Sequence, residues 1–200
     1  MYMSQSIIII RHADDLDSDW PLSSDVFTLP SGDSIEVPQH GLTDEGFARA
    51  RLLATAIPQW TTANGIDSIT RVITKDPSLL TETPNPFDTI RPFIMAQNIM
   101  DVELLPDLPT LTVIFKNNQL LPSYGSLLIC WDAEGIWGDK INGKRPPVPA
   151  FNSILGMLKS TTKIDDNSYP EKAGTIYSYT NGKKGVYNLS VYTFVDGEFV

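Results

Sequence analysis

The chain has 200 residues, of which 42% are hydrophobic, so it is long and apolar enough for one domain over residues 1–200. Its 15 Lys and Arg against 24 Asp and Glu argue against a broad nucleic-acid surface, but not against a small phosphate pocket. The single cysteine, Cys130, excludes an intrachain disulfide. A four-residue apolar run near the N-terminus is too short for a signal peptide or a membrane span. We therefore expect a soluble, cytoplasmic protein that binds neither nucleic acid nor membranes. Its oligomeric state is left open.

The first third of the chain predicts a buried strand, a long loop and a helix. The β-branched run from Ile7 to Ile10 is typical of a central parallel strand that is covered on both faces. Residues 13–42 are rich in Pro, Gly, Ser and Asp, and a small hairpin turning at Ser31-Gly32 fits within them. Thr43 is predicted to cap a helix, with acids in its first turn, and Pro58 is predicted to end it.

The middle of the chain continues the alternation of strands and helices. "SITRVITKD", from Ser68 to Asp76, predicts a second strand. "DTIRPFIMAQNIM", from Asp88 to Met100, predicts a second helix, with Pro92 in its first turn, where proline is tolerated. "VELLPD" fits a short strand, whereas "LTVIFKNNQ" fits a strand or a helix equally well.

The last third predicts one more parallel strand, a helix and an antiparallel end. "GSLLICWDAEGI" is typical of a strand followed by a turn, and "FNSILGMLKS" is amphipathic with helical spacing. The tail alternates aromatic and polar residues, with turns at Asn181-Gly182 and Asp196-Gly197. The whole order predicts a three-layer αβα sandwich with a mainly parallel central sheet and an antiparallel C-terminal extension.

Arg11 and His12 stand directly after the most apolar strand. Ligands of open parallel sheets bind at the carboxyl ends of the strands. A neutral histidine there can act as a nucleophile, and an adjacent arginine can hold phosphate oxygens in bidentate fashion. The dipeptide alone is weak evidence and favours a solvated strand end, so its surroundings in the sequence decide how it is interpreted.

Those surroundings resemble a known family. "IIIIRHAD" followed by "LTDEGFARARLLA" is similar to the histidine phosphatase (phosphoglycerate mutase-like) superfamily. Its members begin with an apolar strand, Arg-His-Gly or Arg-His-Ala, a loop, and a helix that starts Leu-Thr-x-x-Gly-x-x-x-Ala. One subgroup also has Arg-Pro followed by Thr at the fifth position. The resemblance spans roughly residues 6–136, and its matching positions here are Leu42, Thr43, Gly46, Ala50, Arg91 and Pro92, with Met95 in place of the Thr.

The resemblance implies hydrolysis of a phosphomonoester without a metal or another cofactor. His12 would be the nucleophile that forms a phosphohistidine, and Arg11 and Arg91 would hold the phosphoryl oxygens of a phosphorylated small molecule. Alternatively, Arg91 is a helix-surface residue paired with Asp88. Mutase activity is less expected, because no residues are seen that would select a sugar acid or sugar phosphate.

The second histidine of the family is missing. The Arg-Pro subgroup often has Cys-Trp-Glu-His at the end of a later strand, where this chain has Cys130-Trp131-Asp132-Ala133. His40 is the other histidine, and it either folds over the site or lies in a solvated loop. Losing one donor to the phosphoryl group costs on the order of 10²–10³ in rate. The chain is therefore a weak enzyme, an enzyme that uses another group, a mutated form, or a pseudophosphatase that binds phospho-ligands or regulates.

The general acid has several candidates. Some branches of the family place it directly after the second histidine, which is Glu134 here, and others take it from an earlier loop, where Asp14, Asp15 and Asp76 lie. Each of these acids can also be simply exposed. Trp131 either packs beside the pocket or lies in the core, and Cys130 is expected to be a buried small hydrophobic residue. The sequence has no Cys/His cluster for zinc and no glycine-rich phosphate loop.

Overall fold

The computed structural model describes residues 5–13, 24–38, 41–79, 84–116, 122–131, 176–181 and 187–200. In chain order, its elements are β1 (Ser6–Arg11), β2 (Ser24–Thr28), β3 (Ser34–Pro38), α1 (Asp44–Ala63), β4 (Ile69–Lys75), α2 (Asn85–Ala96), β5 (Asp101–Leu105), α3 (Leu108–Lys116), β6 (Ser126–Trp131), β7 (Ile176–Asn181), β8 (Tyr187–Tyr192), β9 (Phe194–Val195) and β10 (Glu198–Phe199). The predicted helix over residues 151–160 lies outside the described residues.

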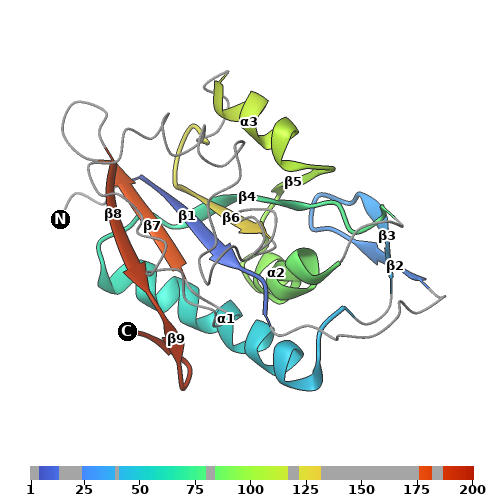
Figure 1. Ribbon diagram of the computed structural model, residues 1–200, viewed down its shortest axis with the longest axis horizontal. Helices are drawn as coiled ribbons and strands as arrows, with labels where there is room; N and C mark the ends of the chain where they lie inside the picture. Colours follow the sequence, from blue (N-terminus) through green and yellow to red (C-terminus); the bar gives the residue numbers. More distant parts are fainter. Residues whose placement is uncertain are drawn as a thin grey trace, which may run out of the picture.

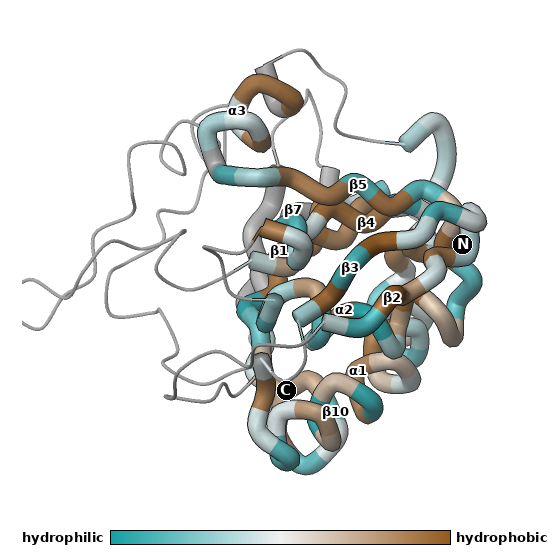
Figure 2. Tube along the Cα trace, turned by 90° about the vertical axis from the view of Figure 1, so that its right-hand side faces the viewer, coloured by the Kyte–Doolittle hydropathy of each residue, from teal (hydrophilic) through white to brown (hydrophobic). Residues whose placement is uncertain are grey.

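A six-stranded sheet of order β5-β4-β6-β1-β7-β8 forms the centre of the fold (Figure 1). The strands β5, β4, β6 and β1 are parallel, and β7 and β8 extend the sheet as an antiparallel pair. The parallel sheet and the antiparallel C-terminal extension are therefore confirmed. In Figure 2, the hydrophobic parts of β4 and β5 lie between α3 on one side and α1 and α2 on the other.

The hydrophobic core between the sheet and the helices α1 and α2 explains why the strands are so apolar. Every residue of β6 and the first five of β1 are buried, as expected for strands covered on both faces. The hairpin of β2 and β3 also packs onto this core through Leu29 and Val37. Gly32 has a φ of +96°, which confirms the turn predicted at Ser31-Gly32.

Helix α1 begins as predicted but ends later. The Thr43 side chain accepts a hydrogen bond from the Gly46 amide at 3.0 Å, so the predicted cap is confirmed. The prediction that Pro58 ends the helix is wrong, because α1 continues to Ala63. Proline cannot donate to the carbonyl four residues before it. That carbonyl, Ala54 O, instead accepts from Gln97 Nε2 of the segment after α2, at 3.4 Å.

Helix α2 lies three to four residues earlier in the chain than the predicted range of Asp88 to Met100. Its start contains Pro86, in the first turn where a proline costs no hydrogen bond, whereas Pro92 lies inside the helix and not in its first turn as predicted. The helix ends because Asn98 adopts a φ of +51°. The segment that the sequence left undecided, residues 111–119, is helical as far as Lys116.

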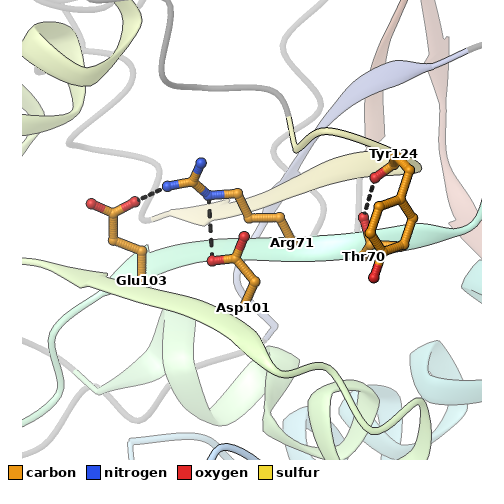
Figure 3. Close-up of polar contacts among 5 residues, drawn as sticks. All are labelled: Thr70, Arg71, Asp101, Glu103 and Tyr124. Carbon is orange, nitrogen blue, oxygen red and sulfur yellow. Dashed lines mark hydrogen bonds and ion pairs between the residues drawn. The ribbon is translucent and has the colours of Figure 1, made fainter.

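Arg71 joins the two strands at the parallel edge of the sheet (Figure 3). Its guanidinium forms an ion pair with Asp101 at 3.7 Å and a second one with Glu103, both on β5. Near the start of β6, Thr70 Oγ1 donates to Tyr124 O at 2.6 Å. Gly125 follows with a φ of +76°, and a Cβ there would lie 2.6 Å from Ser68 O, so only glycine fits.

The C-terminal residues pack against the end of α1. Asp196 and Gly197 both have a positive φ between β9 and β10, which confirms the second turn predicted in the tail. Phe199 and Tyr192 surround the Trp60 ring, with ring centroids 5.7 Å and 5.0 Å away. None of the described helices combines the length and the apolar character that crossing a membrane requires.

Candidate active site

The strands β1 and β6 end side by side. Their parallel register sets Arg11 opposite Trp131, and the backbone amide of His12 donates to Trp131 O at 3.2 Å. Arg11 is half-buried, whereas His12 and Trp131 are 5% and 2% exposed. Trp131 thus lies in a buried position directly beside the Arg11-His12 pair, at the carboxyl edge where open parallel sheets bind ligands.

A hydrogen bond to the backbone determines which ring nitrogen of the neutral His12 imidazole carries the proton. Its Nδ1 lies 2.7 Å from Ala13 O. A carbonyl oxygen can only accept a hydrogen bond, so Nδ1 carries the proton and donates it. In the neutral ring, the lone pair then resides on Nε2. This is the form in which a histidine can attack an electrophilic centre through Nε2.

Helix α2 contacts the same strand end. The backbone amide of Ala13 donates to Thr89 Oγ1 at 2.8 Å, and Thr89 Oγ1 donates to Asn85 O at 2.7 Å. All three residues are buried. The first two turns of α2 are therefore anchored to the residue that directly follows His12.

Arg91 lies on α2 and contacts both its own helix and the hairpin. Its Nη1 is 3.4 Å from Asp88 Oδ1, so the alternative ion pair considered for Arg91 is present. The guanidinium also lies over the Phe27 ring of β2, 5.4 Å from its centroid. The Arg91 side chain is 31% exposed and Asp88 is 2% exposed. These contacts fix Arg91 at the side of α2 that faces the hairpin.

Asp76 follows β4, and its carboxylate is used locally. Oδ1 accepts hydrogen bonds from the Ser78 amide at 2.9 Å and from Ser78 Oγ at 2.7 Å. Its own amide donates to Leu105 O at 2.9 Å. The carboxylate thus stabilises the turn that leaves β4.

Solved structures with a similar arrangement of elements identify the fold. The chain matches the structure assigned to phosphohistidine phosphatase SixA from Agrobacterium tumefaciens, with a TM-score of 0.52 and 11% identity, over 95% of this chain and 99% of the other. It also matches a phosphoglycerate mutase from Plasmodium falciparum, with a TM-score of 0.51 and 11% identity, over 99% of this chain and 94% of the other. No family model and no curated protein matches the sequence.

The chain has the histidine phosphatase fold. The expected phosphoglycerate mutase-like architecture is therefore confirmed. Within this fold, His12 occupies the strand end at which the sequence motif predicts the nucleophile.

Five of the residues predicted for the histidine phosphatase site lie outside the described residues: His40, Ala133, Glu134, Asp14 and Asp15. Trp131 is the last described residue of β6, so Ala133 follows two positions beyond it. The roles given to these residues stay predictions. So does the joint binding of phosphate by Arg11 and Arg91.

Thr89 and Asn85 were missed in the sequence. A signal was present, because Asn85-Pro86 followed by Thr89 matches the spacing of the Arg-Pro motif, with Asn in place of Arg. Gly41 belongs to the same junction, since a Cβ on it would collide with Asn85 Oδ1 and lie 2.7 Å from Pro84 Cγ. The start of α2 is thus packed tightly against the segment that leads into α1.

The described residues contain no group of three or more His, Cys, Asp and Glu that could hold a metal ion. Hydrogen bonds from the Thr110 side chain and backbone lower the pKa of Asp107 below its usual value of 3.8. Asp107 caps the start of α3 in this way, with Oδ1 2.8 Å from the Thr110 amide.

Proposed function

We propose that the protein hydrolyses phosphomonoesters through a phosphohistidine at His12, with low turnover. The observation that carries the proposal is the hydrogen bond from His12 Nδ1 to Ala13 O, which leaves the lone pair on Nε2. This group is buried at the carboxyl edge of a parallel sheet in a histidine phosphatase fold. The substrate class is a phosphorylated small molecule, because the net charge of -9 disfavours a nucleic-acid backbone.

The proposed reaction has two steps. Nε2 of His12 attacks phosphorus, the bond from phosphorus to the ester oxygen breaks, and an acid gives a proton to the departing oxygen. Water then attacks the phosphohistidine, the bond from phosphorus to Nε2 breaks, and the same group accepts a proton from the water. Glu134 is the proposed acid, with Asp76 as the alternative.

The remaining roles complete the proposed phosphate pocket. Arg11 and Arg91 would hold the equatorial oxygens, and Trp131 and His40 would line the substrate side. Ala133 stands where the family has a second histidine, so one donor to the phosphoryl group would be missing. Low turnover follows from that loss, on the order of 10²–10³-fold by analogy with oxyanion-hole donors.

A direct test measures turnover of p-nitrophenyl phosphate in EDTA. Wild type should show slow hydrolysis that His12→Ala abolishes. His40→Ala removes the other imidazole of the chain but not the proposed nucleophile, so it should weaken substrate binding and still hydrolyse the ester. Equal rates for wild type and His12→Ala would refute the proposal.

A second candidate function is binding of a phosphorylated ligand without turnover. The position of Arg91 favours it, since Arg91 is paired with Asp88 and stacked on Phe27, and the Arg-Pro motif spacing also fits Asn85. A pocket with Asn85 at the position of the motif arginine and Ala133 at the position of the second histidine would have fewer hydrogen-bond donors to phosphate. Phosphate should then raise the melting temperature by mass action, with no product formed. An unchanged melting temperature across millimolar phosphate would count against both candidates.

A further inference from the structure

The backbone carbonyl and amide of Ala13 both form hydrogen bonds, one with His12 and one with Thr89. Its carbonyl accepts from His12 Nδ1 at 2.7 Å, and its amide donates to Thr89 Oγ1 at 2.8 Å. Ala13 is 1% exposed, so water does not replace either partner. The conformation of this one residue therefore determines where the acceptor for the imidazole lies.

The Thr89 hydroxyl is itself oriented. It donates its proton to Asn85 O, one helical turn earlier, at 2.7 Å. A hydroxyl has one proton and two lone pairs, so this donation turns a lone pair towards the Ala13 amide. Thr89 is also fully buried at 0% exposure, which removes competition from solvent.

We propose that Thr89 is a positioning residue for His12, which keeps the Nδ1–H tautomer of the imidazole by fixing Ala13. In this arrangement the hydroxyl of α2 holds the Ala13 amide, and the Ala13 carbonyl holds Nδ1–H of the ring. The effect of Thr89 on the reactivity of His12 rests on the proposed function, since it matters only if Nε2 is the attacking atom. The effect of Thr89 on the tautomer of His12 is independent of the proposed function.

The first experiment observes the ring directly. Imidazole nitrogens labelled with ¹⁵N report the tautomer of each neutral histidine, and a His40→Gln background leaves only His12. The Nδ1–H tautomer is expected with Thr89, and a clear shift towards the Nε2–H tautomer is expected in Thr89→Val. Valine keeps the shape of threonine but removes the acceptor for Ala13.

Two variants separate this effect from a general loss of packing. Thr89→Ser keeps the hydroxyl and should restore the wild-type tautomer. Thr74→Val is the matched control, because Thr74 is also fully buried, and its Oγ1 has no hydrogen-bond partner in the part of the chain that the structure describes. Thr74→Val should leave the ¹⁵N signals of His12 unchanged. A Thr89→Val protein that keeps the wild-type tautomer would overturn the inference.

Wild-type hydrogen exchange covers the case in which Thr89→Val does not fold. The Ala13 amide should be among the protected amides, because its acceptor is a buried side chain. Exchange of the Ala13 amide as fast as that of exposed residues would overturn the inference without any substitution.

The rate of His12 phosphorylation separates this inference from the proposed function. If both hold, Thr89→Val should slow phosphorylation by about 10-fold or more, by analogy with the partners that orient metal-bound histidines, and Thr89→Ser should recover it. If wild type forms no phosphohistidine but Thr89→Val still shifts the tautomer, the proposed function fails and the positioning role stands. If phosphorylation proceeds equally in both proteins with an unchanged tautomer, the positioning role fails alone.

Discussion

The strands β1 and β6 are neighbours that end side by side, but the residues that follow them differ in how well they match the histidine phosphatase pattern. After β1, the Arg11-His12 pair is present, and His12 and Ala13 are held by hydrogen bonds to β6 and α2. After β6, the sequence resemblance predicts that Ala133 stands in place of the second histidine of the pattern. In the proposed function, the attacking group and the group that would stabilise its transition state thus come from two different strand ends.

This difference separates two properties that usually occur together. A neutral imidazole with its lone pair on Nε2 supplies the attacking atom, whereas rapid turnover also needs donors for the developing charge. We therefore expect nucleophilic capacity at the β1 end and a deficit at the β6 end. Substitutions at each end should change one property at a time.

The largest effect is expected from Ala133→His. Restoring the second imidazole should raise turnover of p-nitrophenyl phosphate by roughly 10²-fold, the scale of one transition-state hydrogen bond. The same substitution in a His12→Ala background should give no gain. A crystal structure of an anion complex checks the geometry, since the Ala133 Cβ should lie within one side chain's reach of the anion. A Cβ that faces the opposite side of the sheet would contradict the alignment at "CWDA".

Next in size is the effect of the proposed acid. Glu134→Gln should slow hydrolysis of an alkyl phosphate by about 10²-fold, the lower range for general acid catalysis. It should change p-nitrophenyl phosphate much less, because that leaving group needs little protonation. Asp76→Asn is the comparison, since Asp76 accepts two hydrogen bonds from Ser78. If Asp76→Asn instead slows hydrolysis of the alkyl phosphate more than that of p-nitrophenyl phosphate, the general acid is Asp76, after β4, and not Glu134, after β6.

Arg91→Ala tests whether α2 contributes a phosphate clamp. Removing a charge-assisted contact should weaken phosphate binding by about 10-fold, measured from the concentration dependence of the melting temperature. Arg91→Lys should weaken it less, because the charge remains but the bidentate fork is lost. An unchanged phosphate affinity in Arg91→Ala would indicate that Asn85, and not Arg91, stands at the arginine position of the Arg-Pro motif. The pocket would then lack the guanidinium expected from that position.

The smallest effect is expected at Asp107, whose carboxylate caps α3 shortly after the end of β5. Asp107→Ala should lower stability by about 1 kcal/mol or less, as for an exposed helix cap. The pKa of Asp107 is lowered in the fold, so its stabilisation is present above the unfolded pKa of 3.8 and is lost as pH falls through the lower folded pKa. Asp107→Asn keeps a capping oxygen and should remove this pH dependence. An identical acid unfolding profile for Asp107→Asn and wild type would contradict it.

Local patterns in the sequence predicted those elements whose signals are local. The apolar run of β1, the Thr43 cap of α1 and the turns at Ser31-Gly32 and Asp196-Gly197 were predicted correctly, whereas Gly182 of the third predicted turn lies outside the described residues. The end of α1 was not predicted correctly, because Pro58 acts as a breaker only if the carbonyl it leaves unpaired finds no other donor. Gln97, 43 residues away from Ala54, supplies that donor, and nothing near Pro58 in the sequence indicates it.

In the candidate site, too, the residues with a local signal in the sequence were predicted, and the contacts between distant residues were not. Arg11 and His12 could be placed because they stand at the end of a recognisable strand. The contact between Ala13 and Thr89 joins residues 76 positions apart, so no window of the sequence contains both. The partner of Arg91 was predicted correctly as one alternative, because Asp88 lies one helical turn before it.

The isomer of phosphohistidine formed at His12 tests the central claim most directly. Incubation with p-nitrophenyl phosphate, rapid quenching in alkali and ³¹P NMR of the digested protein identify the nitrogen that carries phosphorus. Because Nδ1 donates its proton to Ala13 O, the account predicts phosphorus on Nε2 of His12 and none in His12→Ala. Phosphorus on Nδ1, on His40, or on no histidine under conditions in which the ester is hydrolysed would contradict it.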